Sequence, residues 1–285
     1  MKTKFFLIIV ALAIFSLTSC SKKVVLDQAG IDLADDDAVV EAIFDDIFNS
    51  ADNAELMLGD YLKGETKSVV VLDSCPAVTI DHPSDNIWPK TITIDYGDGC
   101  TGFWDNTRSG KIIITVTGPR MTTGSRKTIT FNSYFFNGIG VEGTKEIENK
   151  GYNDDQNLLI SITLTGGKLT LPDGRIIERS FEHQREWIAG LLTRNIWDDE
   201  CLVTGTATGT GLKGIQYTKT ITSALHWKRV CKFFVSGVLK IEREGLETLE
   251  LNYGEGECDA SAIVTMGGES KEITLRHRHR LWNGF

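Results

Sequence analysis

Acidic residues alternate with glycines in one short segment, Asp95-Tyr96-Gly97-Asp98-Gly99-Cys100. Calcium prefers several oxygen ligands on a tight turn, which makes Asp95 and Asp98 the calcium candidates of this chain. The segment lacks the regular alternate-residue spacing of a calcium-binding loop, and Asp-Gly pairs favour hairpin turns for conformational reasons alone. A structural turn is therefore the favoured interpretation, and neither a metal nor another cofactor is expected.

The same pattern occurs twice in the chain. Residues 92–100 read ITIDYGDGC, and residues 249–258 read LELNYGEGEC. A further cysteine precedes each copy, Cys75 before the first and Cys231 before the second. We interpret the two segments as copies of one strand–turn–cysteine module, which predicts an internal duplication.

The duplication predicts which cysteines pair. The expected disulfides are Cys75–Cys100 and Cys231–Cys258. Closing a loop of about 25 residues would stabilise the fold by roughly 3 to 4 kcal/mol on the entropic model. Structural zinc is the competing interpretation, but these cysteines lack close Cys-x-x-Cys spacing. Cys201 is left over and has no histidine near it in sequence, so a buried thiol is favoured over a nucleophile.

Other residues that could do chemistry are scattered. Trp88 and Trp104 flank the first copy, where exposed indole rings would suit stacking on sugars; core packing is the alternative. His277 and His279 are two residues apart, but the arginines around them repel a cation. Neither a Gly-x-Ser-x-Gly elbow nor a phosphate-binding glycine loop occurs. Carboxylates are plentiful, so a hydrolase that uses two of them is the alternative to a non-catalytic function.

The first twenty residues have the pattern of an export signal. Lys2 and Lys4 precede an apolar run, residues 5–15, that is too short to cross a membrane comfortably. Leu17-Thr18-Ser19-Cys20 then resembles the cleavage site of a bacterial lipoprotein, in which Cys20 is lipidated and residues 1–19 are removed. Acyl chains such as palmitate bury methylenes at roughly 0.8 kcal/mol each, so Cys20 is expected to hold the protein on a membrane.

Residues 20–34 are interpreted as a flexible tether, and residues 35–63 as an amphipathic helix. Three aspartates at 35–37 suit the first turn of a helix, where N–H groups lack partners. The apolar stripe, which is expected to pack on the following domain, consists of Val39, Val40, Ile43, Phe44, Ile47, Phe48, Ala51, Ala54 and Leu58. Acidic residues, among them Asp46, Asp52 and Glu55, are expected on the opposite face. Residues 184–192 are the other helix candidate.

From residue 67 to 280 the apolar period changes to two, as in antiparallel strands with one polar face. Examples are Ile112, Ile114 and Val116, then Leu158, Ile160, Ile162 and Leu164. Glycine-containing turn sequences separate the strands. The prediction is a mostly β domain: an antiparallel meander that forms a curved sheet, half-barrel or sandwich, with pseudo-repeats near 67–150 and 200–280.

The chain has 285 residues and a formal net charge of −9, which argues against nucleic-acid binding, since that requires clustered Lys and Arg. Together, the lipoprotein signal, the aspartate-rich helix, Asp95 to Cys100 and Ser109-Gly110-Lys111-Ile112-Ile113-Ile114 resemble uncharacterised envelope lipoproteins of the Bacteroidota. The resemblance implies no activity. Surface export in such bacteria is associated with acidic residues after the lipid cysteine, whereas Ser21-Lys22-Lys23 is basic, which favours the periplasmic face of the outer membrane.

The sequence therefore predicts a lipid-anchored envelope protein, attached to the membrane through its N-terminal lipid. Its expected role is non-catalytic binding or scaffolding, with a glycan, a protein or a hydrophobic ligand as the partner. A carboxylate-dependent hydrolase acting on envelope or dietary glycans is the alternative.

Overall fold

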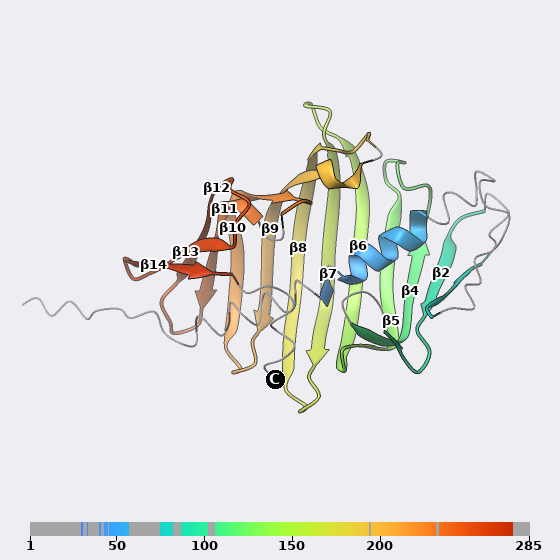
Figure 1. Ribbon diagram of the computed structural model, residues 1–285, viewed down its shortest axis with the longest axis horizontal. Helices are drawn as coiled ribbons and strands as arrows, with labels where there is room; N and C mark the ends of the chain where they lie inside the picture. The colour runs from blue at the N-terminus through green and yellow to red at the C-terminus, as the bar shows by residue number, and fades with distance from the viewer. Residues whose placement is uncertain are drawn as a thin grey trace, which may run out of the picture.

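The computed structural model describes residues 30, 33, 40, 43, 44, 46–56, 75–81, 87–101, 106–193, 195–231 and 234–275. Its main feature is one antiparallel sheet of 14 strands (Figure 1). The strands are β1 (Ala77–Ile80), β2 (Lys90–Asp95), β3 (Cys100–Thr101), β4 (Thr107–Val116), β5 (Arg126–Phe136), β6 (Ile139–Tyr152), β7 (Leu158–Thr170), β8 (Ile176–Ala189), β9 (Glu200–Thr210), β10 (Gln216–Lys228), β11 (Phe234–Arg243), β12 (Leu249–Glu255), β13 (Ser261–Met266) and β14 (Glu269–Thr274). The predicted mostly β fold is confirmed.

The sheet is a meander, in which strands that follow one another in the chain lie side by side. Among the described strands, the two-residue β3 departs from this order, because it pairs with β4 while β2 also pairs with β4. The order begins with β1 and ends with β14, so the sheet is open. Because the described strands all belong to one sheet, the sandwich is excluded from the three predicted forms.

Antiparallel strands place their connections alternately at two ends of the sheet (Figure 1). The end drawn at the top, which we call the upper end, holds the connections 117–125, 153–157 and 256–260, together with the described residues 190–193, 195–199 and 229–231. The β1–β2 connection belongs to it too, because Lys90 pairs with the last residue of β4, Val116. The opposite, lower end includes the connections 96–99, 137–138, 171–175, 211–215, 244–248 and 267–268.

Side chains alternate between two faces of the sheet, and the core lies on one of them. Ile114, Ile129, Lys145, Leu164 and Phe181 lie opposite one another on five neighbouring strands, and all five are buried. We call this the inner face. The intervening residues point to the outer face and are mainly polar, as expected for a sheet that is solvated on one side.

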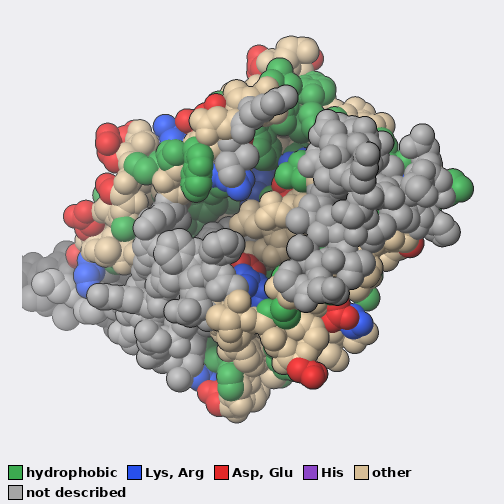
Figure 2. All heavy atoms as spheres, turned by 45° about the vertical axis from the view of Figure 1, so that its right-hand side comes forward, with side chains coloured by type: hydrophobic (Ala, Val, Ile, Leu, Met, Phe, Trp, Pro, Cys, Tyr) green, Lys and Arg blue, Asp and Glu red, His purple; other side chains and the backbone are tan. Residues whose placement is uncertain are grey.

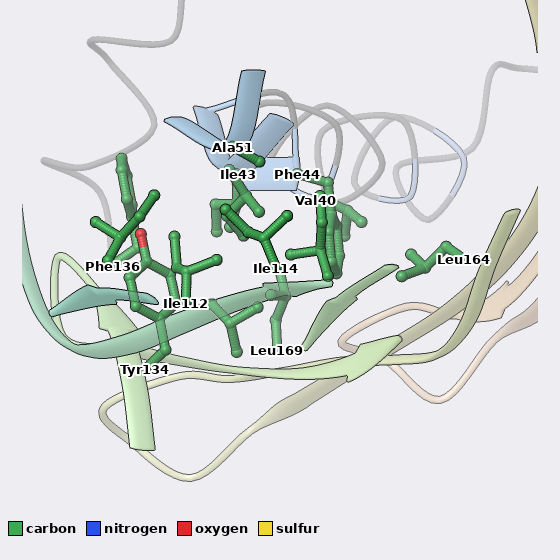
Figure 3. Close-up of a cluster of buried hydrophobic side chains, with 14 of the residues drawn as sticks. Val40, Ile43, Phe44, Ala51, Ile112, Ile114, Tyr134, Phe136, Leu164 and Leu169 are labelled. Atoms are coloured by element: carbon green, nitrogen blue, oxygen red, sulfur yellow. The ribbon is translucent and has the colours of Figure 1, made fainter. Parts of the chain in front are cut away.

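Residues 46–56 form a helix on the inner face. Ile43, Phe44, Ile47 and Ala51 are at most 1% exposed and belong to the same apolar cluster as the inner residues of β2, β4 and β5. Figure 3 shows Ile43, Phe44 and Ala51 facing the apolar side chains of the strands. Burial of each large apolar side chain contributes roughly 1.5–3 kcal/mol. The helix therefore forms part of the core.

Several predictions concern residues outside the described ones. They include the signal peptide 1–19, Cys20, both ends of the helix predicted over 35–63, and Trp104. Within the segment predicted as a tether, Gly30 and Leu33 are described; both are helical and buried. Leu33 belongs to a second apolar cluster with inner residues of β9 to β13, such as Val203 and Leu239.

The helix predicted at residues 184–192 is wrong. Residues 184–189 continue β8, which pairs with β7 on one side and β9 on the other. The only helical turn nearby in this described stretch is the 3₁₀ turn η2 (Ile196–Asp198). Strand pairing on both sides outweighs the local apolar spacing of this segment.

The two predicted disulfides are present, with Cα–Cα distances of 5.6 Å for Cys75–Cys100 and 5.3 Å for Cys231–Cys258. The same hydrogen bond precedes the second cysteine of each pair. In the first copy the Gly97 N–H donates to Asp95 Oδ1 over 2.8 Å, and in the second the Gly254 N–H donates to Asn252 Oδ1 over 2.9 Å. Both glycines have positive φ angles, which explains why glycine recurs there.

Candidate functional site

The outer face carries a continuous row of polar side chains that crosses most of the sheet. The row consists of Thr91, Thr115, Thr128, Glu146, Thr163, Glu182, Thr206, Thr220, Lys240, Glu250, Thr265 and Ser270. Each residue lies opposite the next, so the row repeats with the strand separation of about 4.8 Å. None of these side chains is buried. The row is therefore a regular array of hydroxyl and charged groups that faces solvent.

A cleft of about 800 Å³ lies near the lower end, across five neighbouring strands from β7 to β11. Three consecutive residues of each strand line it. They are Gly166–Lys168, Glu178–Ser180, Thr208–Thr210, Gln216–Thr218 and Glu242–Glu244. Meander pairing brings these segments together, although they are spread over nearly eighty residues of sequence.

Two of the five central residues are glycines, and the other three, Arg179, Tyr217 and Arg243, have side chains on the inner face. Arg179, Tyr217 and Arg243 are at most 5% exposed, so they contribute mainly backbone to the cleft. The residues on either side of them are half-buried or exposed and point to the outer face. The side chains that a ligand in the cleft can reach are therefore those of the outer face.

Gly209 permits close packing beneath the cleft. It lies opposite Tyr217 in the β9–β10 register. A Cβ atom at this position would lie 2.8 Å from Tyr217 Oη and 2.9 Å from Cζ. The tyrosine ring therefore packs directly against the backbone of β9, in space that any other residue would fill.

The exposed groups of the cleft are hydroxyls, one amide and several charges. Ser180, Thr208, Thr210 and Thr218 supply hydroxyls, and Gln216 supplies the amide. Hydroxyls and amides both donate and accept hydrogen bonds. They can therefore bind the hydroxyl groups of a ligand without selecting for its charge.

The charged residues that line the cleft are three glutamates and three cations, the latter being Lys168, Arg179 and Arg243. Lys168 Nζ lies 2.7 Å from Glu142 Oε1, so its charge is already compensated. Among the described residues, Glu178, Glu242 and Glu244 form no ion pair. The formal charges of the lining therefore balance, which is compatible with a neutral ligand.

The spacing of these carboxylates bears on the hydrolase alternative. Glu178 on β8 and Glu242 on β11 are three strands apart, or about 14 Å at the backbone. Glu242 and Glu244 are two residues apart on one strand, about 7 Å at the backbone. Glycosidases use two carboxyl groups about 5–9.5 Å apart on opposite sides of the scissile bond. Only the second pair has a comparable spacing, and its members project from the same strand.

The inner face carries cations that bind the helix. Arg108 donates to both carboxylate oxygens of Asp46, over 2.6 and 3.0 Å. Lys127 Nζ donates to Glu55 Oε2 over 2.7 Å and to Asp52 Oδ1 over 3.2 Å. The expectation that these acidic residues lie opposite the apolar stripe is wrong, because they flank the stripe and reach the strands. Figure 2 shows Lys and Arg side chains recessed in this side of the molecule.

The cavity between helix and sheet is small. Its volume is about 50 Å³, and it is lined by Phe48, Asp52, Glu55, Lys127 and Trp187, among others. Sites for drug-sized ligands occupy about 300–1,000 Å³. This cavity is therefore too small to hold a lipid chain, so it does not support the hypothesis of a hydrophobic ligand.

Asp95 of the calcium hypothesis already has two partners. Its Oδ1 accepts from the Gly97 N–H, and its Oδ2 lies 2.7 Å from Lys111 Nζ. The Lys111 hydrogen bond, with that of Gly97, lowers the pKa of Asp95 below its ordinary value. Asp98 is exposed in the turn. Within the described residues, His, Cys, Asp and Glu side chains form no group of three that could hold a metal ion.

The predicted tryptophan platform stays a prediction, since Trp104 lies outside the described residues. Trp88 is half-buried against the larger apolar cluster, and Lys90 Nζ lies 5.4 Å from its ring centroid. Cys201 is buried among Leu158 and Trp187, and burial raises the pKa of its thiol to about 12. Such a thiol is a poor nucleophile.

Sequence reasoning did not identify the residues of the cleft. The available signal was the alternation Thr204-Gly205-Thr206-Ala207-Thr208-Gly209-Thr210, which places hydroxyls on one face and small residues on the other. It does not indicate which other strands lie alongside, so it could not locate a cleft.

Comparisons with protein-family models, curated proteins and solved structures found no match to this chain. In the part of the chain that the structure describes, no helix has both the length and the apolar character needed to cross a membrane.

Proposed function

We propose that this protein is a lipid-anchored, non-catalytic envelope module that binds a neutral glycan on the outer face of its sheet. The observation that carries the binding proposal is the cleft over β7 to β11, with its hydroxyl groups and the Gln216 amide. The anchor is proposed from the sequence around Cys20, on the periplasmic face of the outer membrane.

A glycan suits the cleft better than the other two ligand classes considered. Sugars present many hydroxyls, which pair with the hydroxyl, amide and carboxylate groups of the lining. The strand spacing of about 4.8 Å is also close to the length of one sugar unit in an extended polysaccharide. A hydrophobic ligand would lack partners for these groups, which would be costly to desolvate.

The described lining offers no exposed aromatic ring for stacking, because Tyr217 is buried. Hydrogen bonds at a solvated surface contribute modestly, roughly 0.5–1.5 kcal/mol each. We therefore expect weak binding of each sugar unit, and binding that strengthens with chain length.

Titration of the protein with neutral hexasaccharides of glucose, mannose, xylose and N-acetylglucosamine, followed by calorimetry, tests the binding proposal. Replacing Thr208 and Gln216 by alanine should weaken binding of whichever sugar binds. Thr128→Ala is the matched control, since Thr128 lies on the same face outside the cleft. The proposal fails if none of the sugars binds, or if the control weakens binding as much as the cleft variants.

The anchor is tested separately with Cys20→Ser. We expect the wild-type protein to incorporate labelled palmitate and to fractionate with membranes. The variant should remain unlabelled and should be found in the soluble fraction. Absence of label in the wild type would refute the anchor without bearing on the cleft.

A carboxylate-dependent hydrolase is the second candidate. The Glu242–Glu244 spacing of about 7 Å at the backbone is the observation that favours it, although both side chains project from the same strand. Release of reducing ends from the hexasaccharide that binds, abolished by Glu242→Gln or Glu244→Gln, would replace the non-catalytic proposal with this one. Binding without any release would support a purely binding role.

A further inference from the structure

The cleft over β7 to β11 is elongated across the strands. Its floor is the backbone of one row of residues, each directly opposite the next in the strand register: Gly167, Arg179, Gly209, Tyr217 and Arg243. Because each floor residue belongs to a different strand, the row runs at right angles to the strands. At about 4.8 Å per strand, the floor is roughly 19 Å long.

Two rows of outer-face residues form the walls of the cleft. The wall nearer the lower end consists of Lys168, Glu178, Thr210 and Gln216, and is extended by Glu244 in the turn after β11. The opposite wall consists of Ser180, Thr208, Thr218 and Glu242. Residues two apart on a strand are separated by about 7 Å, so the cleft is narrow along the strands.

The lining itself indicates the face on which the cleft opens. It contains the residues immediately before and after each floor residue, and the side chains of these neighbours point to the outer face. Inner-face residues two positions from the floor, such as Ile177, Ala207 and Ile241, are buried and do not line the cleft. The space between the walls is therefore accessible from the outer face.

These dimensions favour a linear ligand that lies across the strands. Across the sheet, such a ligand meets five strands in succession, whereas along any one strand the cleft offers three residues. A chain parallel to the strands would leave the cleft within about 7 Å, but a chain at right angles to them would remain in contact for roughly 19 Å.

The two central strands of the cleft carry neutral groups on the outer face. β9 contributes Thr208 and Thr210, and β10 contributes Gln216 and Thr218. Hydroxyl and amide groups donate as well as accept hydrogen bonds. The middle of a bound chain therefore faces groups that suit the hydroxyls of a sugar on both walls.

We propose that the cleft holds an extended, β-linked polysaccharide that crosses the strands at right angles, with one sugar unit over each of the five strands. This inference rests on the proposed glycan binding and names the form of the glycan. An extended, ribbon-like chain keeps its units in one line, with hydroxyls on both edges, so each unit reaches both walls. An α-linked chain that coils into a helix turns away from the floor and loses register with the strands.

The length of the lining limits how many units contribute. At the β7 end, Lys168 Nζ lies 2.7 Å from Glu142 Oε1 of β6, which closes the lower wall. At the other end, the pairing of β11 with β12 stops at Ile241, before Glu242. Binding should therefore strengthen with each sugar unit up to about five and then level off.

A chain-length series tests this inference on the full-length protein. Calorimetry is carried out with β-1,4-linked oligomers of glucose, mannose, xylose and N-acetylglucosamine, from two to eight units, and with α-1,4-linked glucose oligomers. For the β-linked series that binds, the Kd should fall roughly two- to tenfold per added unit, as expected for one additional hydrogen bond. The Kd should become constant at about five units, and the α-linked oligomers should bind more weakly at every length.

Four variants distinguish a chain across the strands from one along them. Glu178→Ala on β8 and Glu242→Ala on β11 remove exposed wall residues that are three strands apart, and each should weaken binding of the hexasaccharide several-fold. Thr206→Ala and Thr220→Ala are the matched controls, because they lie on the outer face of the central strands but outside the lining. These two variants should bind as the wild type does.

The outcomes separate this inference from the proposed function. Weaker binding in Thr206→Ala or Thr220→Ala, with normal binding in the two glutamate variants, would show a chain that follows the strands and would overturn the inference. A Kd that keeps falling up to eight units, or equal binding of the α-linked series, would also overturn it and leave glycan binding intact. Absence of binding by every oligomer would instead refute the proposed function, and the inference with it.

Discussion

Lys127 Nζ on β5 lies 2.7 Å from Glu55 Oε2 on the helix, and both side chains are less than 10% exposed. Lys127 also reaches Asp52, which in turn pairs with Arg120 over 2.9 Å. Removal of one partner from a buried pair is costly, because the other charge remains buried without compensation. The pair is therefore expected to contribute, with the Arg108–Asp46 pair and the buried apolar stripe, to holding the helix on the sheet.

Lys127→Met should lower the free energy of unfolding by about 3 kcal/mol, because the Glu55 carboxylate loses its cation. The double variant Lys127→Met/Glu55→Gln should recover much of this loss, since it leaves no unpaired charge at that position. Urea unfolding followed by circular dichroism measures both. A double variant no more stable than Lys127→Met alone would show that the ion pair is not the source of the effect.

Stability should also fall in acid through Asp52. Burial alone would raise the pKa of its carboxyl, but the Lys127 ammonium and the Arg120 guanidinium outweigh burial and hold the pKa below the ordinary value of 3.8. A group whose pKa is lower in the folded state stabilises the fold fully above its unfolded pKa. That contribution is lost as the pH falls through the folded pKa, so the free energy of unfolding should drop below about pH 4. Asp52→Asn should be less stable at neutral pH and should flatten this acid decline; an unchanged decline would contradict the assignment.

The strands were predictable from sequence, because an apolar period of two specifies both the strand and its buried face. The two disulfides were predictable for a different reason: the repeated motif around Cys100 and Cys258 implies equivalent partners upstream. Neither inference requires knowledge of which strands are neighbours. The cleft does require it, since it forms only where β7 to β11 lie side by side.

The acidic face of the helix shows where the sequence pattern was misread. Asp46, Asp52 and Glu55 were expected to lie away from the domain, as charges on an amphipathic helix usually do. The strands contain the missing signal: Lys127 and Lys145 fall in phase with the buried residues Ile129 and Ile147. A cation in phase with an apolar strand face implies an anion packed over it, and the acidic helix is the segment that supplies anions.

Alkylation of thiols can distinguish Cys201 from the four cysteines that form disulfides. Burial raises the pKa of Cys201 to about 12, and the other four form disulfides, so none should react with iodoacetamide at pH 8 in the folded state. Unfolding without reductant should expose one thiol, that of Cys201, and reductant should expose the rest. Mass spectrometry of the alkylated peptides reads each site. Modification of Cys75 or Cys258 before reduction would contradict the disulfide pairing.

Gly209→Ala tests the packing beneath the cleft. The added methyl group would meet the Tyr217 ring and the carbonyl oxygen of Glu178, so one of the strands must move. Overpacking of this kind costs about 1–3 kcal/mol, which thermal or urea unfolding would detect. Gly214→Ala gives a contrasting control, since a Cβ there would meet no atom within 4 Å, and any loss would reflect only its φ of 74°. Glycan binding is then measured for both variants. Weaker binding by Gly209→Ala, with unchanged binding by Gly214→Ala, would show that the close packing of the β9 backbone on Tyr217 helps to position the exposed groups of the cleft. Full stability in Gly209→Ala would show instead that the Tyr217 ring and the backbone of β8 both adjust at little cost.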